Sequence, residues 1–306
     1  MSRIHEALKK AELERAASQG GMAESADLGV HPGQDYASTG MPEAQAPVVS
    51  AGPSFATAFS FDALLARCPQ GSWRPDPKTM LFFNGDEQAY GTEEFRTLRS
   101  RLYQMREKQG LRKLLISSSL PKEGKSFVAA NLAQVIVRQQ GRRVLLIDAD
   151  LRGPQLHNNF GTTSTPGLAE YLRGENDEFG VMQRGPMENL FFIPSGKAMT
   201  NPGELVANGR LKFLLSRVEP LFDWIIIDSP PAVPVSDAAL LANYCDGVLM
   251  VVRSNATPFD IARKARQEFA GKNLVGVVLN GIEAGSSPYT EYYYSAYGRP
   301  NGKAEA

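Results

Sequence analysis

Six short apolar segments that alternate with helical patterns constrain the fold of this 306-residue chain more than any other feature. They are rich in Val, Ile and Leu and span residues 113–118, 143–148, 190–194, 223–228, 247–253 and 274–279. Continuous apolar runs of this length are typical of strands buried on both faces, as in a parallel sheet covered by helices. Helices are predicted before and between them, at 91–108, 125–140, 203–218, 236–243 and 258–270. The sequence therefore predicts an α/β domain with a doubly wound, mostly parallel sheet.

The rest of the chain is predicted to form further parts around this domain, which we place at residues 75–283. Residues 1–17 have apolar side chains at helical spacing and are predicted to form an amphipathic helix, either docked on a membrane partner or free. Residues 18–74 are predicted to be a flexible linker, because Gly and Pro recur and little apolar surface offsets the chain entropy. Residues 284–306 follow the last strand as a tail.

Composition and charge exclude several classes of protein. The 33 basic residues balance the 33 acidic ones, so the net charge does not indicate nucleic acid as a partner. No apolar run approaches the ~20 residues that a membrane-spanning helix needs, and the first residues lack the apolar segment of a secretory signal. Cys68 and Cys245 are far apart and lack the spacing of a zinc site or a disulfide framework. We therefore expect a cytoplasmic protein.

A phosphate-binding loop is predicted directly after the segment 113–118. The chain there reads SLPKEGKSF and matches the pattern G-x-x-x-x-G-K-[ST], except that Ser119 replaces the first glycine. In such a loop Gly124 lets backbone N–H groups approach phosphate, Lys125 neutralises it, and Ser126 holds magnesium at a helix N-terminus. The predicted nucleotide-binding residues are Pro121, Lys122, Glu123, Gly124, Lys125, Ser126 and Phe127. On the loop alone, the alternative is a chance G-K-S turn that joins a strand to a helix.

Two predicted strands end in aspartates at the edge of the sheet where the loop also lies. Asp148 and Asp150 come at the end of the segment 143–148, and Asp228 ends the segment 223–228. Ligands of an open parallel sheet bind outside the carboxyl ends of the strands, so these side chains and the loop should converge. Carboxylates there can bind magnesium, directly or through water, or accept a hydrogen bond from an attacking hydroxyl. Taken singly, each motif is equally well explained as a cap of the next helix or turn.

The three motifs SLPKEGKS, VLLIDADLR and IIIDSPP resemble the Walker A, Walker A′ and Walker B motifs of the bacterial tyrosine autokinases, whose second motif carries Asp-x-Asp-x-Arg. The start SRIHEALKKAE is similar to that of the subgroup associated with exosortase and exopolysaccharide gene clusters. The resemblance implies a P-loop NTPase fold of the deviant Walker, partition-ATPase-like type, with ATP and Mg²⁺ bound. The implied catalytic residues are Lys125, Asp148, Asp150 and Arg152, and the implied metal ligands are Ser126, Asp150 and Asp228.

The tail holds half of the ten tyrosines of the chain, at Tyr289, Tyr292, Tyr293, Tyr294 and Tyr297. Gly, Ser, Pro and Glu surround them without a helical or alternating apolar pattern, so the segment has no obvious way to bury the rings. A sticky interaction tail is one interpretation. The resemblance implies another, a multi-site phosphoacceptor whose hydroxyl groups Asp148 would orient.

The helix predicted at 91–108 carries Glu93, Arg96 and Arg99, which match the family's E-x-x-R-x-x-R oligomerisation motif. Their i,i+3 spacing places them on one helix face, and a solvated charged face is the alternative. With the resemblance, we expect a ring-like homo-oligomer in which each tail is phosphorylated by the adjacent subunit. The resemblance also implies an activator, a membrane-embedded polysaccharide chain-length or co-polymerase protein, that would hold the kinase peripherally at the inner membrane.

The leading hypothesis is an ATP-dependent protein-tyrosine autokinase that phosphorylates its own tail and regulates exopolysaccharide biosynthesis or export. The alternative is a partition or septum-positioning ATPase switch, although such proteins carry a lysine early in the loop, at the position of Leu120. A scaffold with a decayed ATP site is a third reading, against which the intact Lys125 and Ser126 count. Asn280, at the end of the last predicted strand, either hydrogen-bonds adenine or forms a turn before Gly281.

Overall fold

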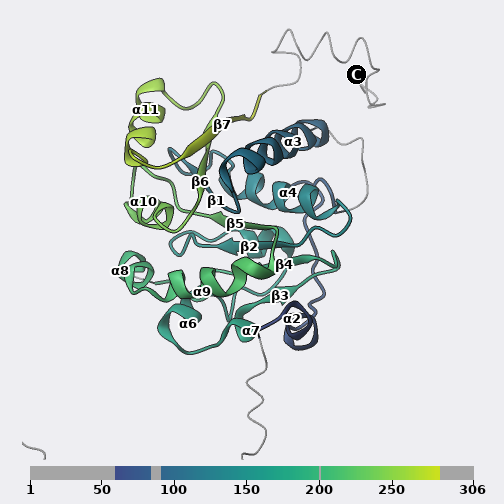
Figure 1. Cartoon of the computed structure of the whole chain (residues 1–306). Coiled ribbons are helices and arrows are strands. Elements are labelled where there is room, and N and C mark those ends of the chain that lie inside the picture. The colour runs from purple at the N-terminus through teal and green to yellow at the C-terminus, as the bar shows by residue number, and fades with distance from the viewer. Residues whose placement is uncertain (1–58, 84–90, 200, 283–306) are drawn as a thin grey trace, which may run out of the picture. The chain divides into compact units, whose positions relative to one another are not determined.

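The computed structural model describes residues 59–83, 91–199 and 201–282, which contain a seven-stranded sheet of order β3-β4-β2-β5-β1-β6-β7 (Figure 1). The strands are β1 (Lys113–Ser118), β2 (Val144–Asp148), β3 (Gln183–Arg184), β4 (Leu190–Ile193), β5 (Trp224–Asp228), β6 (Gly247–Arg253) and β7 (Leu274–Asn280). Every neighbouring pair is parallel except β3 with β4. The predicted doubly wound, mostly parallel sheet is confirmed. The short antiparallel β3 was not predicted, because two residues carry no periodic signal.

Helices connect the strands on both faces of the sheet. They are α2 (Phe61–Arg67), α3 (Thr92–Gln109), α4 (Lys125–Val137), α5 (Leu156–Phe160), α6 (Leu168–Arg173), α7 (Glu178–Val181), α8 (Pro202–Ala207), α9 (Arg210–Val218), α10 (Asp237–Ala242) and α11 (Phe259–Glu268), with the 3-10 helix η1 (Glu219–Leu221). The helices predicted at 91–108, 125–140, 236–243 and 258–270 correspond to α3, α4, α10 and α11.

Side chains of the central strands alternate between two apolar clusters, one on each face of the sheet. In β5, Trp224 and Ile226 belong to one cluster, whereas Ile225 and Ile227 belong to the other, and all four are fully buried. The first cluster includes residues of α3, α4 and α5, and the second includes residues of α2 and of α6 to α11. Because both faces are packed, the ends of β1, β2 and β5 are held in fixed positions.

The single helix predicted over 203–218 is wrong, because the chain forms two helices there, α8 and α9. The break falls at Gly209, whose φ of 82° lies in the left-handed region that favours glycine. After the break, α9 buries Leu211, Leu214, Leu215 and Val218. The apolar spacing continues across the break, so it did not reveal the interruption. The Asn208-Gly209 pair was the available signal, since glycine commonly follows the last residues of a helix.

The folded domain also begins earlier than predicted. Helix α2 lies within the predicted linker 18–74, and Ser60 caps it by accepting a hydrogen bond from a backbone N–H at 3.2 Å. Leu64 is fully buried, and the ring of Phe61 packs edge-on against Phe191 with centroids 5.5 Å apart. The composition of the long Gly- and Pro-containing stretch concealed this short apolar helix at its end.

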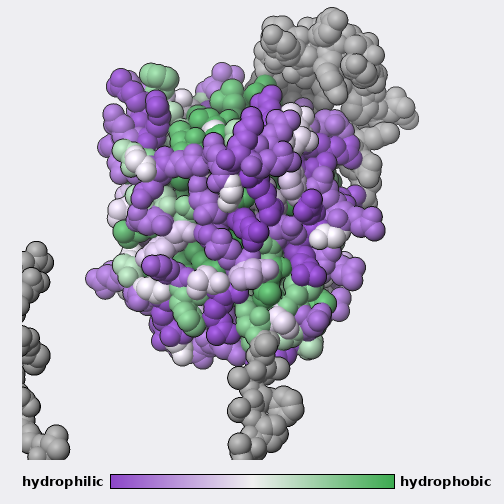
Figure 2. All heavy atoms as spheres, viewed as in Figure 1, coloured by the Kyte–Doolittle hydropathy of each residue, from purple (hydrophilic) through white to green (hydrophobic). Residues whose placement is uncertain are grey.

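The predicted helix at 1–17, the linker up to residue 58 and the tail at 284–306 lie outside the described residues. Among the residues that are described, we find no helix with the length and apolar character needed to cross a membrane. The face drawn in Figure 2 is mostly hydrophilic, and apolar residues show mainly between the helices.

We predict that Leu64→Ala destabilises the whole domain, because removal of a fully buried leucine side chain costs about 2–5 kcal/mol of unfolding free energy. Urea denaturation followed by circular dichroism measures the change. The matched control is Ala66→Ser on the exposed side of the same helix, for which we expect about 0.5 kcal/mol. Equal losses in the two variants would show that α2 does not pack on the domain as described.

Candidate active site

Three parallel strands bring the predicted site residues to one edge of the sheet. β5 lies between β1 and β2, and its last residue, Asp228, is in register with Asp148 of β2 and Ile116 of β1. The phosphate loop follows β1, and the turn that carries Asp150 follows β2. Lys125 and the three aspartates therefore meet at the carboxyl ends of neighbouring strands, where open α/β sheets bind ligands.

The phosphate loop requires glycine at position 124 for two reasons. The φ of Gly124 is 96°, and a Cβ there would lie 2.0 Å from Nδ2 of Asn280. The same Asn280 amide donates a hydrogen bond to the Glu123 carbonyl at 2.9 Å. Asn280, the last residue of β7, thus holds the phosphate loop through its side-chain amide. Neither of its two sequence interpretations included this role.

The Glu123 side chain is buried and is hydrogen-bonded within the protein. It is only 3% exposed, and one carboxylate oxygen accepts a hydrogen bond from the Leu120 N–H at 2.7 Å. The other oxygen accepts a hydrogen bond from the Thr257 hydroxyl, in the turn between β6 and α11. The carboxylate therefore helps to fix the shape of the loop. Thr257 is far away in the sequence, so no local pattern pointed to it.

The ammonium group of Lys125 lies between two carboxylates. Its Nζ is 2.7 Å from Oδ2 of Asp150 and 3.7 Å from Oδ2 of Asp228. Burial by itself lowers the pKa of this lysine, but the attraction of Asp228 and Asp150 outweighs burial and raises it. The Ser126 hydroxyl donates to the same Asp228 oxygen at 2.5 Å. The positive charge of Lys125 therefore lies among the carboxylates of the site.

The site holds more carboxylates than this one lysine balances. Asp148 and Asp228 are fully buried, and burial raises the pKa of both, that of Asp228 to about 6. Oδ1 of Asp228 is buried and has no hydrogen-bond partner within the described part of the chain. Hard oxygen donors with an unused acceptor suit Mg²⁺, which binds one or two carboxylates and keeps waters and phosphate oxygens. Ser126, Asp150 and Asp228 thus fit the predicted magnesium site.

Asp148 and Asp150 also shape the turn after β2. Asp148 accepts a hydrogen bond from the Asp150 N–H on Oδ1 and one from the Leu156 N–H on Oδ2, both at 3.2 Å. Asp150 in turn accepts from the Gly153 N–H on Oδ1 at 2.9 Å, while its Oδ2 faces Lys125. Both oxygens of Asp148 are therefore engaged with backbone, and Asp150 is the carboxylate nearer to the lysine.

Asp237, which the sequence analysis missed, holds Arg152 at the rim of the site. Arg152 donates two hydrogen bonds to this carboxylate, from Nε to Oδ2 at 2.6 Å and from Nη2 to Oδ1 at 3.2 Å. Asp237 is the buried first residue of α10, whereas the Arg152 side chain is 41% exposed. An aspartate in the first turn of a helix is ordinary, so its sequence position gave no sign of this pairing.

The three residues of the predicted oligomerisation motif make different contacts in α3. Glu93 and Arg96 form an ion pair within the helix, and the Glu93 side chain is 56% exposed. Arg99 instead donates a hydrogen bond to the carbonyl of Val135, near the end of α4, at 2.8 Å. Glu93 is therefore on the surface, Arg96 is half-buried, and Arg99 is used inside the domain.

A cavity of about 390 Å³ adjoins the phosphate loop between α3, α4 and β7. Its walls are mostly apolar and include Phe127, Val278 and Asn280. Phe127 follows the loop directly, so this cavity and the phosphate loop are neighbouring parts of one site.

Comparison with known proteins shows the family to which this site belongs. Residues 122–259 match the family model described as an AAA domain. The chain is 35% identical to tyrosine-protein kinase YwqD of Bacillus subtilis (strain 168), over 68% of this chain and 88% of YwqD. Its structure resembles the kinase domain of the Escherichia coli tyrosine kinase ETK, with a TM-score of 0.63 and 33% identity over 67% of this chain and 82% of that chain. The chain belongs to the bacterial tyrosine-protein kinase family, as its motifs predict.

A longer relative shows that the shared region can be part of a larger protein. The chain is 36% identical to the putative tyrosine-protein kinase EpsB of Ralstonia nicotianae (strain ATCC BAA-1114 / GMI1000). The match covers 70% of this chain but spans only 30% of the length of EpsB.

We predict that Asp228 makes the domain less stable as the pH rises. Its pKa is about 6 in the folded protein against an ordinary value of 3.8, so between these values the folded protein keeps a proton that the unfolded chain releases. The stability that this group contributes is therefore complete below pH 3.8 and is lost as the pH rises through about 6. Asp228→Asn removes the titration, so the stability of the parent relative to the variant should fall across this window.

Urea denaturation at successive pH values measures the effect, and Asp260→Asn, a change at an exposed carboxylate, is the control. A stability difference between parent and Asp228→Asn that stays constant across the window would contradict the raised pKa.

Proposed function

We propose that this chain is an ATP-dependent protein-tyrosine kinase that transfers a phosphoryl group to tyrosines of its own tail. One observation carries the proposal: Lys125 at the start of α4 contacts Asp150 and Asp228, beside a loop whose Gly124 has no room for a side chain. A phosphate-binding loop, a lysine and two carboxylates are parts that phosphoryl transfer uses. Membership of the bacterial tyrosine-protein kinase family supports the choice of acceptor.

ATP would bind with its phosphates over residues 121–127, where backbone N–H groups of the loop and the start of α4 are available. Lys125 would exchange its carboxylate contacts for phosphate oxygens and neutralise them. The base would enter the cavity of about 390 Å³ beside Phe127. Apolar walls suit a purine ring, and the side-chain carbonyl of Asn280 can accept a hydrogen bond from an exocyclic amine.

Ser126, Asp150 and Asp228 would hold Mg²⁺, which when bound supplies positive charge against the phosphate oxygens. The unused Oδ1 of Asp228 supports this assignment, because it leaves an acceptor for a metal ion on a carboxyl whose pKa is raised by burial. A free tyrosine has a pKa of ~10 and a carboxylate one of ~4, so the protein orients the hydroxyl and does not deprotonate it fully before transfer.

The structure refines the role that the sequence suggests for Asp148. Its two oxygens accept backbone hydrogen bonds, and the side chain is fully buried. We therefore propose that Asp148 first positions the turn that carries Asp150, and that it orients the tyrosine hydroxyl only when the Leu156 N–H is released. Arg152 would stay at the rim, on the Asp237 carboxylate, where an incoming tail passes.

Copies of the chain would form a ring-like oligomer in which each tail reaches the active site of its neighbour. The exposed Glu93–Arg96 pair on α3 supports this arrangement. We propose that a membrane-embedded chain-length or co-polymerase protein activates the kinase at the inner membrane, and that phosphorylation regulates exopolysaccharide biosynthesis or export. These parts of the proposal rest on the family resemblance.

We predict that the full chain incubated with labelled ATP and Mg²⁺ becomes labelled on Tyr289, Tyr292, Tyr293, Tyr294 and Tyr297. Lys125→Met should lower the labelling rate at least about a hundredfold, since it removes one preorganised charge from the transition state. Replacement of the five tyrosines by Phe should abolish labelling while ATP binding stays intact. Mass spectrometry of the tail identifies the modified residues.

Removal of Mg²⁺ with EDTA should also stop labelling, and added Mg²⁺ should restore it. Phosphate release without labelled protein would contradict the kinase and favour the ATPase switch. Failure to bind nucleotide at all would favour the scaffold.

We predict that Glu93→Ala combined with Arg96→Ala lowers the oligomeric state without a large loss of domain stability, because this pair is on the surface. Arg99→Ala is the matched comparison and should destabilise the domain by about 1–3 kcal/mol, since it removes the charged partner of the Val135 carbonyl. Light scattering after size-exclusion chromatography gives the mass, and urea denaturation gives the stability. An unchanged mass in the double variant would remove α3 from the subunit contact.

A further inference from the structure

A second cavity lies at the end of the sheet opposite to the phosphate loop. It has a volume of about 240 Å³, and its lining includes Arg106, Arg112, Arg143 and Asp223. Arg112, Arg143 and Asp223 each come directly before a strand, namely β1, β2 and β5. These strands are parallel, so the cavity lies at their amino ends, while the active site lies at their carboxyl ends. The six residues of β1 place the two sites about 20 Å apart.

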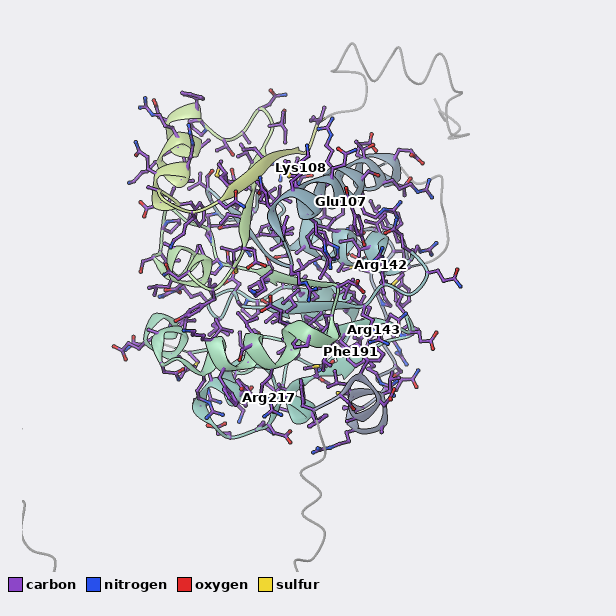
Figure 3. The ribbon with its side chains drawn as sticks, viewed as in Figure 1. Glu107, Lys108, Arg142, Arg143, Phe191 and Arg217 are labelled. Atoms are coloured by element: carbon purple, nitrogen blue, oxygen red, sulfur yellow. The ribbon has the colours of Figure 1, made fainter. Side chains whose placement is uncertain are left out.

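Guanidinium groups outnumber carboxylates at this cavity. Arg142 adds a fourth arginine, 3.1 Å from the Asp223 carboxylate, and Arg106 lies 4.0 Å from the same oxygen. Figure 3 labels Arg142 and Arg143 on one side of the domain, below the end of α3. Outside the lining, the carboxylates of Glu219 and Asp246 lie 2.6 Å and 3.2 Å from Lys113, and Asp246 also accepts hydrogen bonds from the backbone N–H groups of Arg112 and Lys113. Asp223 is thus the single carboxylate in the cavity lining, beside this group of arginines.

Arg106 shows the excess of positive charge most clearly. Its side chain is 19% exposed and lies over the Trp224 ring, 5.3 Å from the centroid. Nη1 of Arg106 is buried and has no hydrogen-bond partner among the described residues. Burial lowers the pKa of this guanidinium, as do the charges of Arg112 and Arg142, while Asp223 acts in the opposite direction. A buried charged donor without an acceptor is costly, and because Arg106 lines the cavity, an anion bound there would offset part of that cost.

We propose that this cavity binds a phosphate monoester dianion. The planar fork of an arginine matches the oxygens of a phosphate group, and several arginines around one phosphate bind it through parallel charge-assisted hydrogen bonds. A dianion also offsets more of the excess charge than a carboxylate does. The cavity is several times larger than the ~30 Å³ of one water molecule, so it admits the phosphate with the first atoms of its carrier.

The site is preorganised for such a ligand. The Arg143 guanidinium is stacked on the Phe61 ring of α2 at 3.7 Å from the centroid, which limits its motion before binding. The short segment at 220–222 completes the lining. Arg106 is held in the same way by the Trp224 ring. Less conformational entropy is therefore lost on binding than with free surface arginines.

The phosphate monoester has two possible carriers in this setting, a phosphorylated tyrosine of the tail and a small phosphate compound. The first rests on the proposed function, because it needs the tail to be phosphorylated. The lining is mostly polar, so the arginines would recognise the phosphate group itself, and the comparison of ligands below separates the two carriers. A tail phosphorylated at one active site would then be retained at the opposite end of the same or a neighbouring subunit.

The test is isothermal titration calorimetry on the full-length Lys125→Met variant, which should label itself very slowly and lacks the ammonium group of the phosphate loop. The ligands are a peptide of residues 289–297 phosphorylated at Tyr293, the same peptide without phosphate, and inorganic phosphate. Arg112→Gln combined with Arg143→Gln should weaken phosphopeptide binding at least about tenfold. The matched control is Arg101→Gln, an exposed arginine on α3 outside the cavity, which should leave the affinity within about twofold. Circular dichroism melts establish that each variant is folded.

Each outcome has a defined meaning. Tighter binding of the phosphopeptide than of free phosphate, lost in the double variant, supports the site and the tail as its ligand. Equal binding of both, lost in the same variant, supports the site with a small phosphate compound. No binding of either, or binding that survives the double substitution, overturns the proposal. Because this assay needs no kinase activity, a chain that binds the phosphopeptide but never labels itself would contradict the proposed function alone.

Discussion

The contact of the Lys125 ammonium with the Asp150 and Asp228 carboxylates is the interaction on which the site depends. It exists because β5 is inserted between β1 and β2, which places the phosphate loop and both acidic turns at adjacent strand ends. Buried charges are costly unless they are paired and hydrogen-bonded, so the packed faces of the sheet must hold these groups rigidly. The fully buried side chains of β5 supply that rigidity. Fold and chemistry are therefore specified by the same strand order.

The negative charge of the site exceeds its positive charge, and this excess favours the binding of a cation. Three carboxylates stand around one lysine, and burial raises the pKa of Asp148 and Asp228. Glu123 is also a buried carboxylate, but the Leu120 N–H and the Thr257 hydroxyl donate hydrogen bonds to it. Added positive charge lowers the cost of the remaining carboxylates, so the site gains most from a metal-bound phosphate, in which anion and cation arrive together. The lysine can then move to phosphate without leaving the aspartates uncompensated.

Sequence patterns were sufficient for six of the seven strands, because those signals are local, while the two-residue β3 gave none. Each buried strand is a continuous apolar run, and the loop and both aspartate turns follow such runs directly. Contacts between distant segments left no local signal. Asp237 was missed because its partner Arg152 is brought to it only by the fold. The packing of α2 was missed for a similar reason, since the burial of Leu64 depends on residues of the sheet far along the chain. Gly209 differs, because its signal was present and the apolar spacing concealed it.

The two ends of the sheet carry opposite charge, but they are too far apart for strong electrostatic coupling. The carboxyl ends of β1, β2 and β5 gather carboxylates, while the amino ends of the same strands gather arginines. The ends are separated by about 20 Å, which exceeds the ~8 Å screening length at physiological ionic strength, so direct Coulomb coupling between them is weak. A phosphorylated segment bound at the amino ends would therefore leave the chemistry at the carboxyl ends nearly unchanged. Its effect would instead come from removing the product tail from the active site and from joining one subunit to another.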